Sequence, residues 1–201
     1  MKKNNKIVIS KKGKFMRIIG GKARGTKLYT LEGNNTRPTL DRVKESLFNI
    51  IQNYIQDSVF LDLFAGSGAI GLEAVSRGAK KSILCDNSKE AINIIKQNIK
   101  KTKFENRIQL YKLPYDKALI EQINEKIDII YIDPPYETNF AYEALKIILE
   151  KELIKQESIV IIETDREEEI EKQLEDLSIE VVSKRKYGRV HLIFLQKEHK
   201  V

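Results

Sequence analysis

Apolar and polar positions along this chain follow two periodicities, and their alternation predicts the order of strands and helices. Short apolar runs rich in β-branched residues, typical of buried strands, lie at 59–64, 82–85, 107–112, 127–132 and 158–163. Segments with helical spacing of apolar residues follow these runs, at 69–77, 88–101, 116–124, 140–151 and 167–176. This pattern predicts an α/β fold with a mostly parallel sheet that is covered by helices on both faces.

The two ends of the chain depart from this alternation. Residues 16–28 mix short apolar stretches with glycines and cations, which predicts a small hairpin whose glycines bring backbone and cations close to phosphate. A helix should begin near Pro38, with an apolar stripe formed by Leu40, Val43, Leu47, Ile50, Ile51 and Tyr54. Two late strands, 178–184 and 189–196, are joined by Tyr187-Gly188 and predict an antiparallel hairpin at the sheet edge. We therefore divide the chain into a flexible basic leader (1–15), a hairpin and helix (16–55) and an α/β domain (56–201).

Composition narrows the class of protein. With 201 residues, 32% of them charged and 41% hydrophobic, the chain suits a soluble globular protein with a proper core. No apolar run approaches the roughly 20 residues that a membrane span needs, and the basic N-terminus lacks the apolar segment of a secretory signal. The lone Cys85 is expected to be a packed small hydrophobe, and two histidines far apart in sequence give no metal-ligand spacing. We expect a cytoplasmic monomer without a metal.

The net charge of +7 is unevenly spread. Residues 1–31 contain ten Lys or Arg and no acidic residue, whereas the other 170 residues contain 26 basic and 29 acidic side chains. A concentrated basic arm on a mildly acidic body indicates a polyanionic partner, nucleic acid first. The alternative is a solvated tail that only aids solubility.

The sequence Asp133-Pro134-Pro135-Tyr136 directly follows the predicted strand 127–132. The two prolines prevent both a continued strand and an immediate helix, so an acid and an aromatic should stay at the carboxyl end of a core strand. Ligands bind at that edge in open α/β sheets. A carboxylate and a proline carbonyl can accept the two N–H groups of an exocyclic amine while the aromatic ring stacks on the base. This arrangement suits methylation of such an amine; the alternative is an ordinary Pro-Pro turn beside a surface tyrosine.

A glycine-rich turn follows the first predicted core strand, in the segment LDLFAGSGAIG (61–71). Gly66, Gly68 and Gly71 fit the pattern G-x-G-x-x-G, and Asp86 lies 20 residues after Gly66 at the end of the next strand. Both features match the dinucleotide fingerprint, so the motif alone does not separate NAD from S-adenosylmethionine. Asp62 favours the latter because its carboxylate could meet the ammonium of the cofactor's amino-acid part. In either case Asp86 would bond the ribose hydroxyls.

These motifs together resemble a known family. FAGSG (64–68) with DPPY (133–136) resembles the amino-methylating class of S-adenosylmethionine-dependent methyltransferases. RIIGGKARG (17–25) and RPTLDRVKESLFN (37–49) resemble the RsmD family, which methylates N2 of a guanine in bacterial 16S ribosomal RNA. The likeness extends over about residues 16–196. FAGSG and DPPY specify only the class, whereas the N-terminal pair is much more particular.

The resemblance implies a Rossmann-like class I methyltransferase fold with a seven-stranded, mostly parallel sheet of order 3-2-1-4-5-7-6, the last strand antiparallel. The N-terminal hairpin and helix would contact RNA, and residues 56–201 would bind the cofactor and carry out catalysis. The implied cofactor-binding residues are Asp62, Phe64, Gly66, Gly68, Asp86, Asn87 and Asp116. The implied target-amine site is Asp133, Pro134 and Tyr136. The implied RNA contacts are Arg17, Lys22, Arg24, Lys27, Arg37 and Arg42.

Two positions depart from the family pattern. Family members commonly have an aromatic residue where Ala23 stands. The adenine contact after the third core strand is often acidic or Asn, whereas this chain has Leu113-Pro114-Tyr115-Asp116, which makes Asp116 the candidate. The leader 1–15 has no family counterpart.

The expected reaction is direct transfer of a methyl group from S-adenosylmethionine to an amine of 16S rRNA, within the small ribosomal subunit or an assembly intermediate. The alternatives are methylation of adenine N6 or cytosine N4 in DNA, methylation of a protein side-chain amide, and a non-enzymatic RNA-binding assembly role. The hypothesis of an NAD-dependent oxidoreductase is the least favoured, because a nicotinamide enzyme has no obvious use for Asp-Pro-Pro-Tyr.

Overall fold

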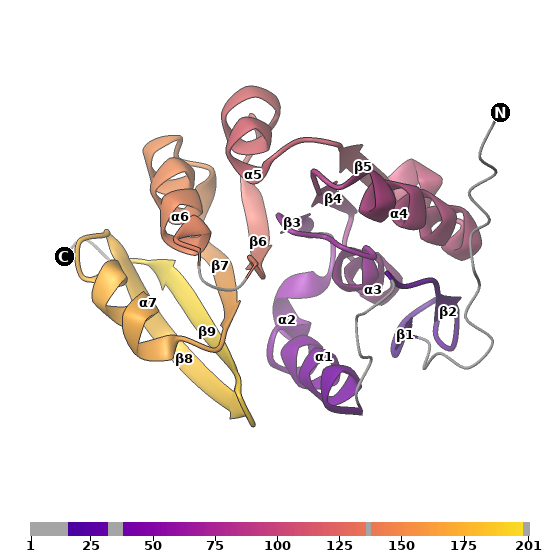
Figure 1. Ribbon diagram of the computed structural model, residues 1–201, viewed down its shortest axis with the longest axis horizontal. Helices are drawn as coiled ribbons and strands as arrows, with labels where there is room; N and C mark the ends of the chain where they lie inside the picture. The colour runs from indigo at the N-terminus through magenta and orange to yellow at the C-terminus, as the bar shows by residue number, and fades with distance from the viewer. Residues whose placement is uncertain (1–15, 32–37, 136–137, 199–201) are drawn as a thin grey trace, which may run out of the picture.

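The computed structural model describes residues 16–31, 38–135 and 138–198. Their core is a seven-stranded sheet of order β5-β4-β3-β6-β7-β9-β8 (Figure 1). The strands are β3 (Val59–Asp62), β4 (Lys81–Cys85), β5 (Ile108–Tyr111), β6 (Ile127–Ile132), β7 (Ile154–Thr164), β8 (Ile179–Tyr187) and β9 (Val190–Lys197). Only β9 runs against its neighbours β7 and β8. Counted from β3, this is the order 3-2-1-4-5-7-6, so the predicted class I methyltransferase topology is confirmed.

Helices cover both faces of the sheet (Figure 1). One face packs against α1 (Pro38–Ile50), α2 (Gln52–Ile55), α3 (Ala69–Arg77) and α4 (Lys89–Thr102). The other face packs against α5 (Tyr115–Lys117), the π-helical turn Ala118–Gln122, α6 (Phe140–Glu150) and α7 (Glu167–Leu174). A 3₁₀ turn, Glu105–Arg107, precedes β5. The buried strands are apolar on both sides, as expected for a sheet with two covered faces. Among the described residues, no helix is long and apolar enough to cross a membrane.

The structure corrects part of the predicted helical stripe. Val43, Leu47 and Ile51 are buried as expected, but Tyr54 is 42% exposed. The buried residues that the pattern missed are Phe48 and Ile55. The helix ends at Ile50 and a separate short helix starts at Gln52, so the helical spacing does not continue through Ile51.

Strand β7 is longer than its apolar run suggests. It begins at Ile154, four residues before the predicted start, and its pairing with β6 shifts between Ile127 and Ile129. The polar residues at this irregularity hid the first part of the strand. In contrast, β3 ends at Asp62, two residues early, because the glycine-rich turn already begins there.

The predicted N-terminal hairpin is present as β1 (Met16–Arg17) paired antiparallel with β2 (Lys27–Leu28). Ile18 and Leu28 are fully buried in an apolar cluster with residues of α3 and α4. This hairpin is therefore packed on the α/β domain as part of its core.

Two of the hairpin glycines lie against α3. A Cβ at Gly21, whose φ is +74°, would lie 1.8 Å from the Ser76 carbonyl oxygen, and a Cβ at Gly20 would lie 2.6 Å from Arg77. These two glycines therefore allow close approach to α3. Gly25 alone among the three hairpin glycines faces open space.

Candidate active site

The glycine-rich turn connects the end of β3 to α3. Gly66 and Gly68 have φ of +54° and +75°, in the left-handed region that favours glycine. A Cβ at Gly66 would meet nothing within 4 Å, whereas one at Gly71 would lie 2.2 Å from Leu84 Cδ2. Gly71 therefore lets α3 pack closely on β4. Gly66 leaves its backbone open to a ligand.

Asp62 lies at the end of β3, directly before this turn, and is only 1% exposed. It accepts hydrogen bonds from the backbone N–H groups of Phe64 and Gly71, while its Oδ1 has no partner in the described residues. Burial raises its pKa from 3.8 to about 7, against the opposing effect of those two hydrogen bonds. A cation placed beside Oδ1 would satisfy this atom and favour the ionised form.

Asp86 lies at the carboxyl end of the neighbouring strand β4 and holds the turn from the other side. Its Oδ2 accepts the Gly66 N–H at 2.9 Å and its Oδ1 accepts the Ser88 N–H at 2.8 Å. Ser88 then caps α4 by accepting the Ala91 N–H at 3.3 Å. The half-exposed Asp86 carboxylate keeps acceptor capacity for hydroxyl groups, and the adjacent Asn87 is exposed.

Asp133 follows β6, which lies beside β3 in the sheet. Asp62 is in register with Tyr131 of β6, and the Leu63 N–H donates to the Tyr131 carbonyl at 3.1 Å. The pairing of β3 with β6 therefore brings Asp62 and Asp133 to the same edge of the sheet, although they lie 71 positions apart in sequence. Pro134 is described and half-buried, whereas Tyr136 lies outside the described residues.

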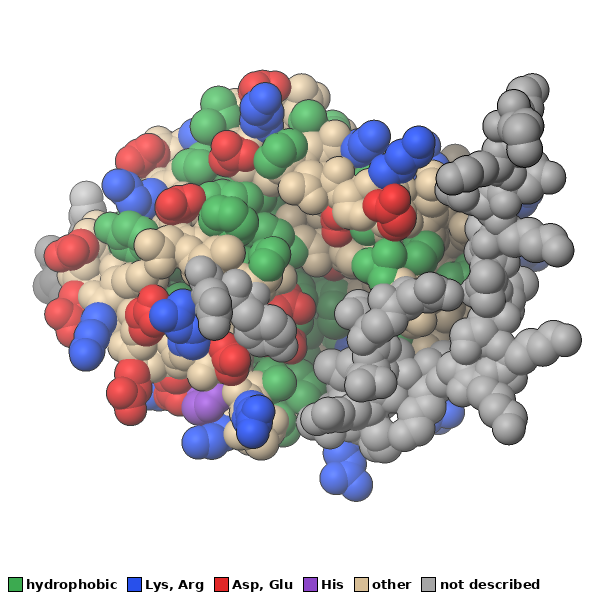
Figure 2. All heavy atoms as spheres, in the orientation of Figure 1, with side chains coloured by type: hydrophobic (Ala, Val, Ile, Leu, Met, Phe, Trp, Pro, Cys, Tyr) green, Lys and Arg blue, Asp and Glu red, His purple; other side chains and the backbone are tan. Residues whose placement is uncertain are grey.

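The Asp133 carboxyl has an unusual environment. The residue is exposed, yet burial by the surrounding protein raises its pKa well above 3.8, and the nearby charges of Glu163 and Asp62 act in the same direction. A carboxyl group in a hollow of the surface can be both exposed and poorly solvated, because water reaches it from one side only. Figure 2 shows the surface hollowed between the part that carries α6 and the part that carries α3 and α4, with β6 between those helices in Figure 1.

Two further groups at this edge escaped the sequence reasoning. One is Glu163 near the end of β7, which accepts a hydrogen bond from the Tyr131 hydroxyl. It could have been found from sequence, because it is an acid at the end of a predicted core strand. The other is an aromatic cluster of Phe64, Tyr115 and Phe140, with ring centroids 5.0–6.4 Å apart. Its members come from the turn after β3 and from the first residues of α5 and α6, so no local pattern indicated the cluster.

The aromatic cluster lies on the opposite face of the sheet from Asp62. Phe64 is half-buried beside the glycine-rich turn, and Tyr115 donates a hydrogen bond to Glu143 of α6. Asp116, the candidate for the adenine contact, is half-exposed in α5 next to Tyr115. The predicted cofactor residues Phe64 and Asp116 therefore lie close to one another, Phe64 within the aromatic cluster and Asp116 directly after its member Tyr115.

Most cations proposed to contact RNA lie on the described part of the arm. Arg17, Lys22, Arg24 and Lys27 are exposed on the hairpin, and Arg42 is exposed on α1. Arg37 lies outside the described residues. The hairpin lies beside α3, the helix that begins at the glycine-rich turn (Figure 1).

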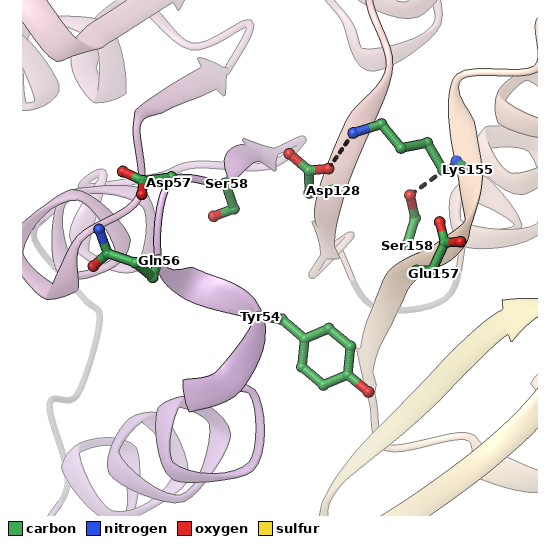
Figure 3. Close-up of a pocket in the computed structure, with 8 residues that line it drawn as sticks. All are labelled: Tyr54, Gln56, Asp57, Ser58, Asp128, Lys155, Glu157 and Ser158. Atoms are coloured by element: carbon green, nitrogen blue, oxygen red, sulfur yellow. Dashed lines mark hydrogen bonds and ion pairs between the residues drawn. The ribbon is translucent and has the colours of Figure 1, made fainter.

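A shallow pocket of about 330 Å³ lies at the opposite edge of the sheet, around the beginnings of β3, β6 and β7 (Figure 3). Its lining residues are Tyr54, Gln56, Asp57, Ser58, Asp128, Lys155, Glu157 and Ser158. Asp128 accepts the Val59 N–H at 2.8 Å and bonds Lys155 Nζ at 2.6 Å, as Figure 3 shows for the lysine. These polar groups hold strands together, so we assign the pocket no part in the site.

Comparison with known proteins agrees with this geometry. The family model described as "Conserved hypothetical protein 95" matches residues 16–196. The Haemophilus influenzae protein named "Ribosomal RNA small subunit methyltransferase D" is 37% identical over 154 residues, which cover 76% of this chain and 80% of that one. Its Escherichia coli namesake is 33% identical and covers 76% of both chains. The solved Escherichia coli structure yhhF has a TM-score of 0.78 and 26% identity, covering 93% of this chain and all of that one.

The chain belongs to the RsmD-like methyltransferase family. Members of this family depend on S-adenosylmethionine, which is therefore the cofactor of this protein. The residues at the β3 edge fit that molecule. The unpartnered Oδ1 of Asp62 suits an ammonium group, and the open space at Gly66 allows a ligand to approach the backbone.

The sequence-predicted residues of this RsmD-like enzyme thus fall into two groups. Those at the ends of β3, β4 and β6, together with Asp116 on α5, lie along one edge of the sheet: Asp62, Phe64, Gly66, Gly68, Asp86, Asn87, Asp116, Asp133 and Pro134. The cations of the arm lie on separate elements that pack against α3.

Proposed function

We propose that this methyltransferase methylates the exocyclic N2 amine of a guanine in 16S rRNA, in the small ribosomal subunit or an assembly intermediate. The observation that carries the proposal is the position of Asp133, directly after β6, the strand that pairs with β3 beside Asp62 and the glycine-rich turn. The relatives named for the small-subunit rRNA support the choice of substrate.

The proposed cofactor site consists of the residues at the ends of β3 and β4. Asp62 would bind the ammonium and Asp86 the ribose hydroxyls, while Gly66 and Gly68 allow the backbone to approach the amino-acid part. Phe64, Asn87 and Asp116 would complete the site around ribose and adenine. S-adenosylmethionine supplies an electrophilic methyl group that needs no covalent enzyme intermediate.

The proposed target site lies at the end of β6. Asp133 and the Pro134 carbonyl would accept the two N–H groups of the guanine amine and draw its lone pair out of conjugation with the ring. Tyr136, which lies outside the described residues, would stack on the base. Taking the guanine out of its stack costs on the order of a few kcal/mol, which these contacts offset. Orientation and electrostatics would then supply most of the rate enhancement.

The arm would bind the phosphates around the target nucleotide. Arg17, Lys22, Arg24, Lys27 and Arg42, with Arg37, form the proposed contact set. Since the hairpin packs on α3, its cations Arg17, Lys22, Arg24 and Lys27 have a defined position relative to the cofactor turn. In this view residues 16–55 hold the RNA and residues 56–201 carry out catalysis, in a monomeric cytoplasmic enzyme.

The substrate is tested by incubating the protein with labelled S-adenosylmethionine and separate samples of rRNA, small ribosomal subunits and DNA. Label mapped to N2 of a guanine in 16S rRNA supports the proposal. Label on adenine N6 or cytosine N4 of DNA, or on the protein components of the subunit, would replace it with one of the other methyl acceptors.

The role of Asp133 is tested by Asp133→Ala. We expect S-adenosylmethionine affinity close to that of the unmodified protein and a methylation rate at least about 100-fold lower, as for removal of a key polar group in an active site. Asp128→Asn is the matched control, because Asp128 lies on the same strand at the opposite sheet edge. Near-normal turnover by Asp133→Ala would refute the assignment.

A further inference from the structure

Glu163 and Asp133 follow the last paired residues of two neighbouring parallel strands. Ile132, the last residue of β6, is in register with Ile162 of β7; Asp133 follows the end of β6, and Glu163 is the next residue of β7. Tyr131 and Ile161 form the preceding pair, and residues two apart on a strand point to the same face, so Glu163 lies on the face that Tyr131 and Asp62 occupy. The charge of Glu163 acts on the Asp133 carboxyl from there.

The Tyr131 hydroxyl fixes Glu163 in this position. Tyr131 is 3% exposed, and its hydroxyl donates to Glu163 Oε2. Glu163 itself is half-buried. A buried hydroxyl needs a hydrogen-bond partner, and the Glu163 carboxylate is the partner of the Tyr131 hydroxyl. This hydrogen bond restrains the Glu163 side chain.

Among residues 16–31, 38–135 and 138–198, few other charges on this face act on the pair. From β3 the neighbour is Asp62, whose charge acts on Asp133. Glu163 is in register with the apolar Leu192 of β9. Lys44, the buried cation of α1, pairs with Glu73 of α3 at 3.3 Å.

The histidine of the described residues, His191, lies on the other face of the sheet. His191 is in register with Thr164, one residue beyond Glu163, and binds Glu167. Among the described residues the cluster therefore consists of three acids and one tyrosine. Burial raises the pKa of Glu163 as well as that of Asp133, against the hydrogen bond from Tyr131, and like charges this close do not both ionise easily.

We propose that Glu163 is a positioning residue that shares one proton with Asp133 and thereby sets the charge of Asp133 when the target amine arrives. This inference rests on the proposed function for the role of Asp133, and it adds a residue that neither the sequence motifs nor the relatives' names indicate. Ionised Asp133 accepts N–H groups well, whereas protonated Asp133 has lost part of that capacity.

The same pair can receive the proton that the reaction releases. When the lone pair of the amine nitrogen forms a bond to the methyl carbon, the bond from that carbon to the donor sulfur breaks, and its electron pair stays on the sulfur of the departing neutral thioether, S-adenosylhomocysteine. The nitrogen becomes positively charged and must lose one of its hydrogens. That proton moves to the Asp133 carboxylate, and its N–H electron pair returns to the nitrogen. The positive charge that enters with the methyl donor thus ends as a proton on the carboxyl pair. The Asp133 and Glu163 carboxyl groups share this proton before it passes to solvent.

The direct test is a titration of the Asp133 carboxyl carbon by NMR, in the full chain without RNA, for the unmodified protein and for Glu163→Gln. Removing the neighbouring negative charge should move the Asp133 midpoint to lower pH. Tyr131→Phe should move it in the same direction, because Glu163 without its hydrogen-bond donor ionises less readily. An Asp133 midpoint that is unchanged in both variants would overturn the proposal.

The second readout is the pH profile of methylation. Glu163→Gln should keep severalfold more of its own maximal rate on the acid side of the profile than the unmodified protein, and Glu163→Asp should restore the original profile in part. Glu167→Gln is the control, because Glu167 lies on the other face and should leave both readouts unchanged. A uniform loss of activity at every pH, with a normal Asp133 titration, would show that Glu163 only supports the fold. If no substrate is methylated while the Asp133 midpoint still shifts, the proposed function fails and the proton sharing stands.

Discussion

Glu73 Oε1 accepts the backbone N–H of Gly20 at 2.7 Å, across 53 positions of sequence. Its other oxygen accepts the N–H of Ile19 at 2.8 Å. Glu73 is fully buried and also contacts Arg77 Nε at 2.8 Å and Lys44 Nζ at 3.3 Å. One carboxylate on α3 thus holds the N-terminal hairpin and helix α1 together, which sets the position of the proposed RNA-binding cations.

Replacing Glu73 by Ala should strongly destabilise the protein. The change leaves Lys44 buried without this anion and leaves two backbone N–H groups without their acceptor. We expect a loss of about 3–5 kcal/mol in the free energy of unfolding, the size seen when one partner of a buried ion pair is removed. Chemical denaturation measures this loss.

The control for Glu73 is Glu125→Ala. Glu125 is 44% exposed and pairs with Lys81 at the surface, so its loss should change stability by less than about 1 kcal/mol. Equal effects of the two substitutions would contradict the anchoring role of Glu73.

Gly66→Ala should weaken cofactor binding beyond its effect on stability. Gly66 has φ of +54° and faces open space, so alanine adds backbone strain of about 1–2 kcal/mol and a methyl group where the ligand approaches. Gly25→Ala is a matched control, because Gly25 lies on the hairpin with φ of +85° and equally open space. Calorimetric titration with S-adenosylmethionine should show about a tenfold loss for Gly66→Ala, or roughly 1.4 kcal/mol, and no loss for Gly25→Ala.

Stability should fall as pH rises through about 7, in part because of Asp62. Its pKa is about 7 in the folded protein and near 3.8 when exposed, so between these values the folded chain holds a proton that the unfolded chain has lost. The stabilising contribution is complete below about pH 3.8 and is lost as pH passes 7. Thermal unfolding across this window should show a smaller pH dependence for Asp62→Asn than for the unmodified protein.

The same ionisation should appear in cofactor binding. The cofactor ammonium favours ionised Asp62, so affinity for S-adenosylmethionine should increase as pH rises through about 7. Below that pH, binding should release a proton, which calorimetry in buffers of different ionisation enthalpy detects. If Asp62→Asn binds with the same affinity and the same proton release, the ammonium contact is wrong.

Binding of RNA should depend steeply on salt. Each phosphate contact that the arm makes should contribute about −0.7 to the log–log slope of affinity against salt concentration. Arg24→Ala and Arg42→Ala should each reduce the steepness by about that amount, whereas Lys172→Ala, an exposed cation on α7, should not. A flat salt response of the unmodified protein would exclude the arm as an electrostatic clamp.

Local patterns were enough to predict most of the sheet. The run 127–132 is β6 without change, and the helix 69–77 is α3 without change, because each has a clear apolar spacing and a sharp boundary. Sequence order also placed Asp86 and Asp133 at strand ends and Asp62 before the glycine-rich turn, and a parallel sheet brings all three to one edge. Prediction failed where an element was interrupted, as at Ile51 and at the start of β7.

From sequence alone, the repeating apolar spacing determined most of the elements, and the motifs predicted which acids lie at the carboxyl ends of core strands. Only the tertiary structure decided that Glu163 stands beside Asp133, that Glu73 holds the hairpin, and that Gly20 and Gly21 lie against α3. The physical reason is the distance along the chain over which each kind of interaction acts. Backbone spacing and turn chemistry act within a few residues, whereas hydrogen bonds between strands and between helix and hairpin join atoms whose separation along the chain has no fixed period.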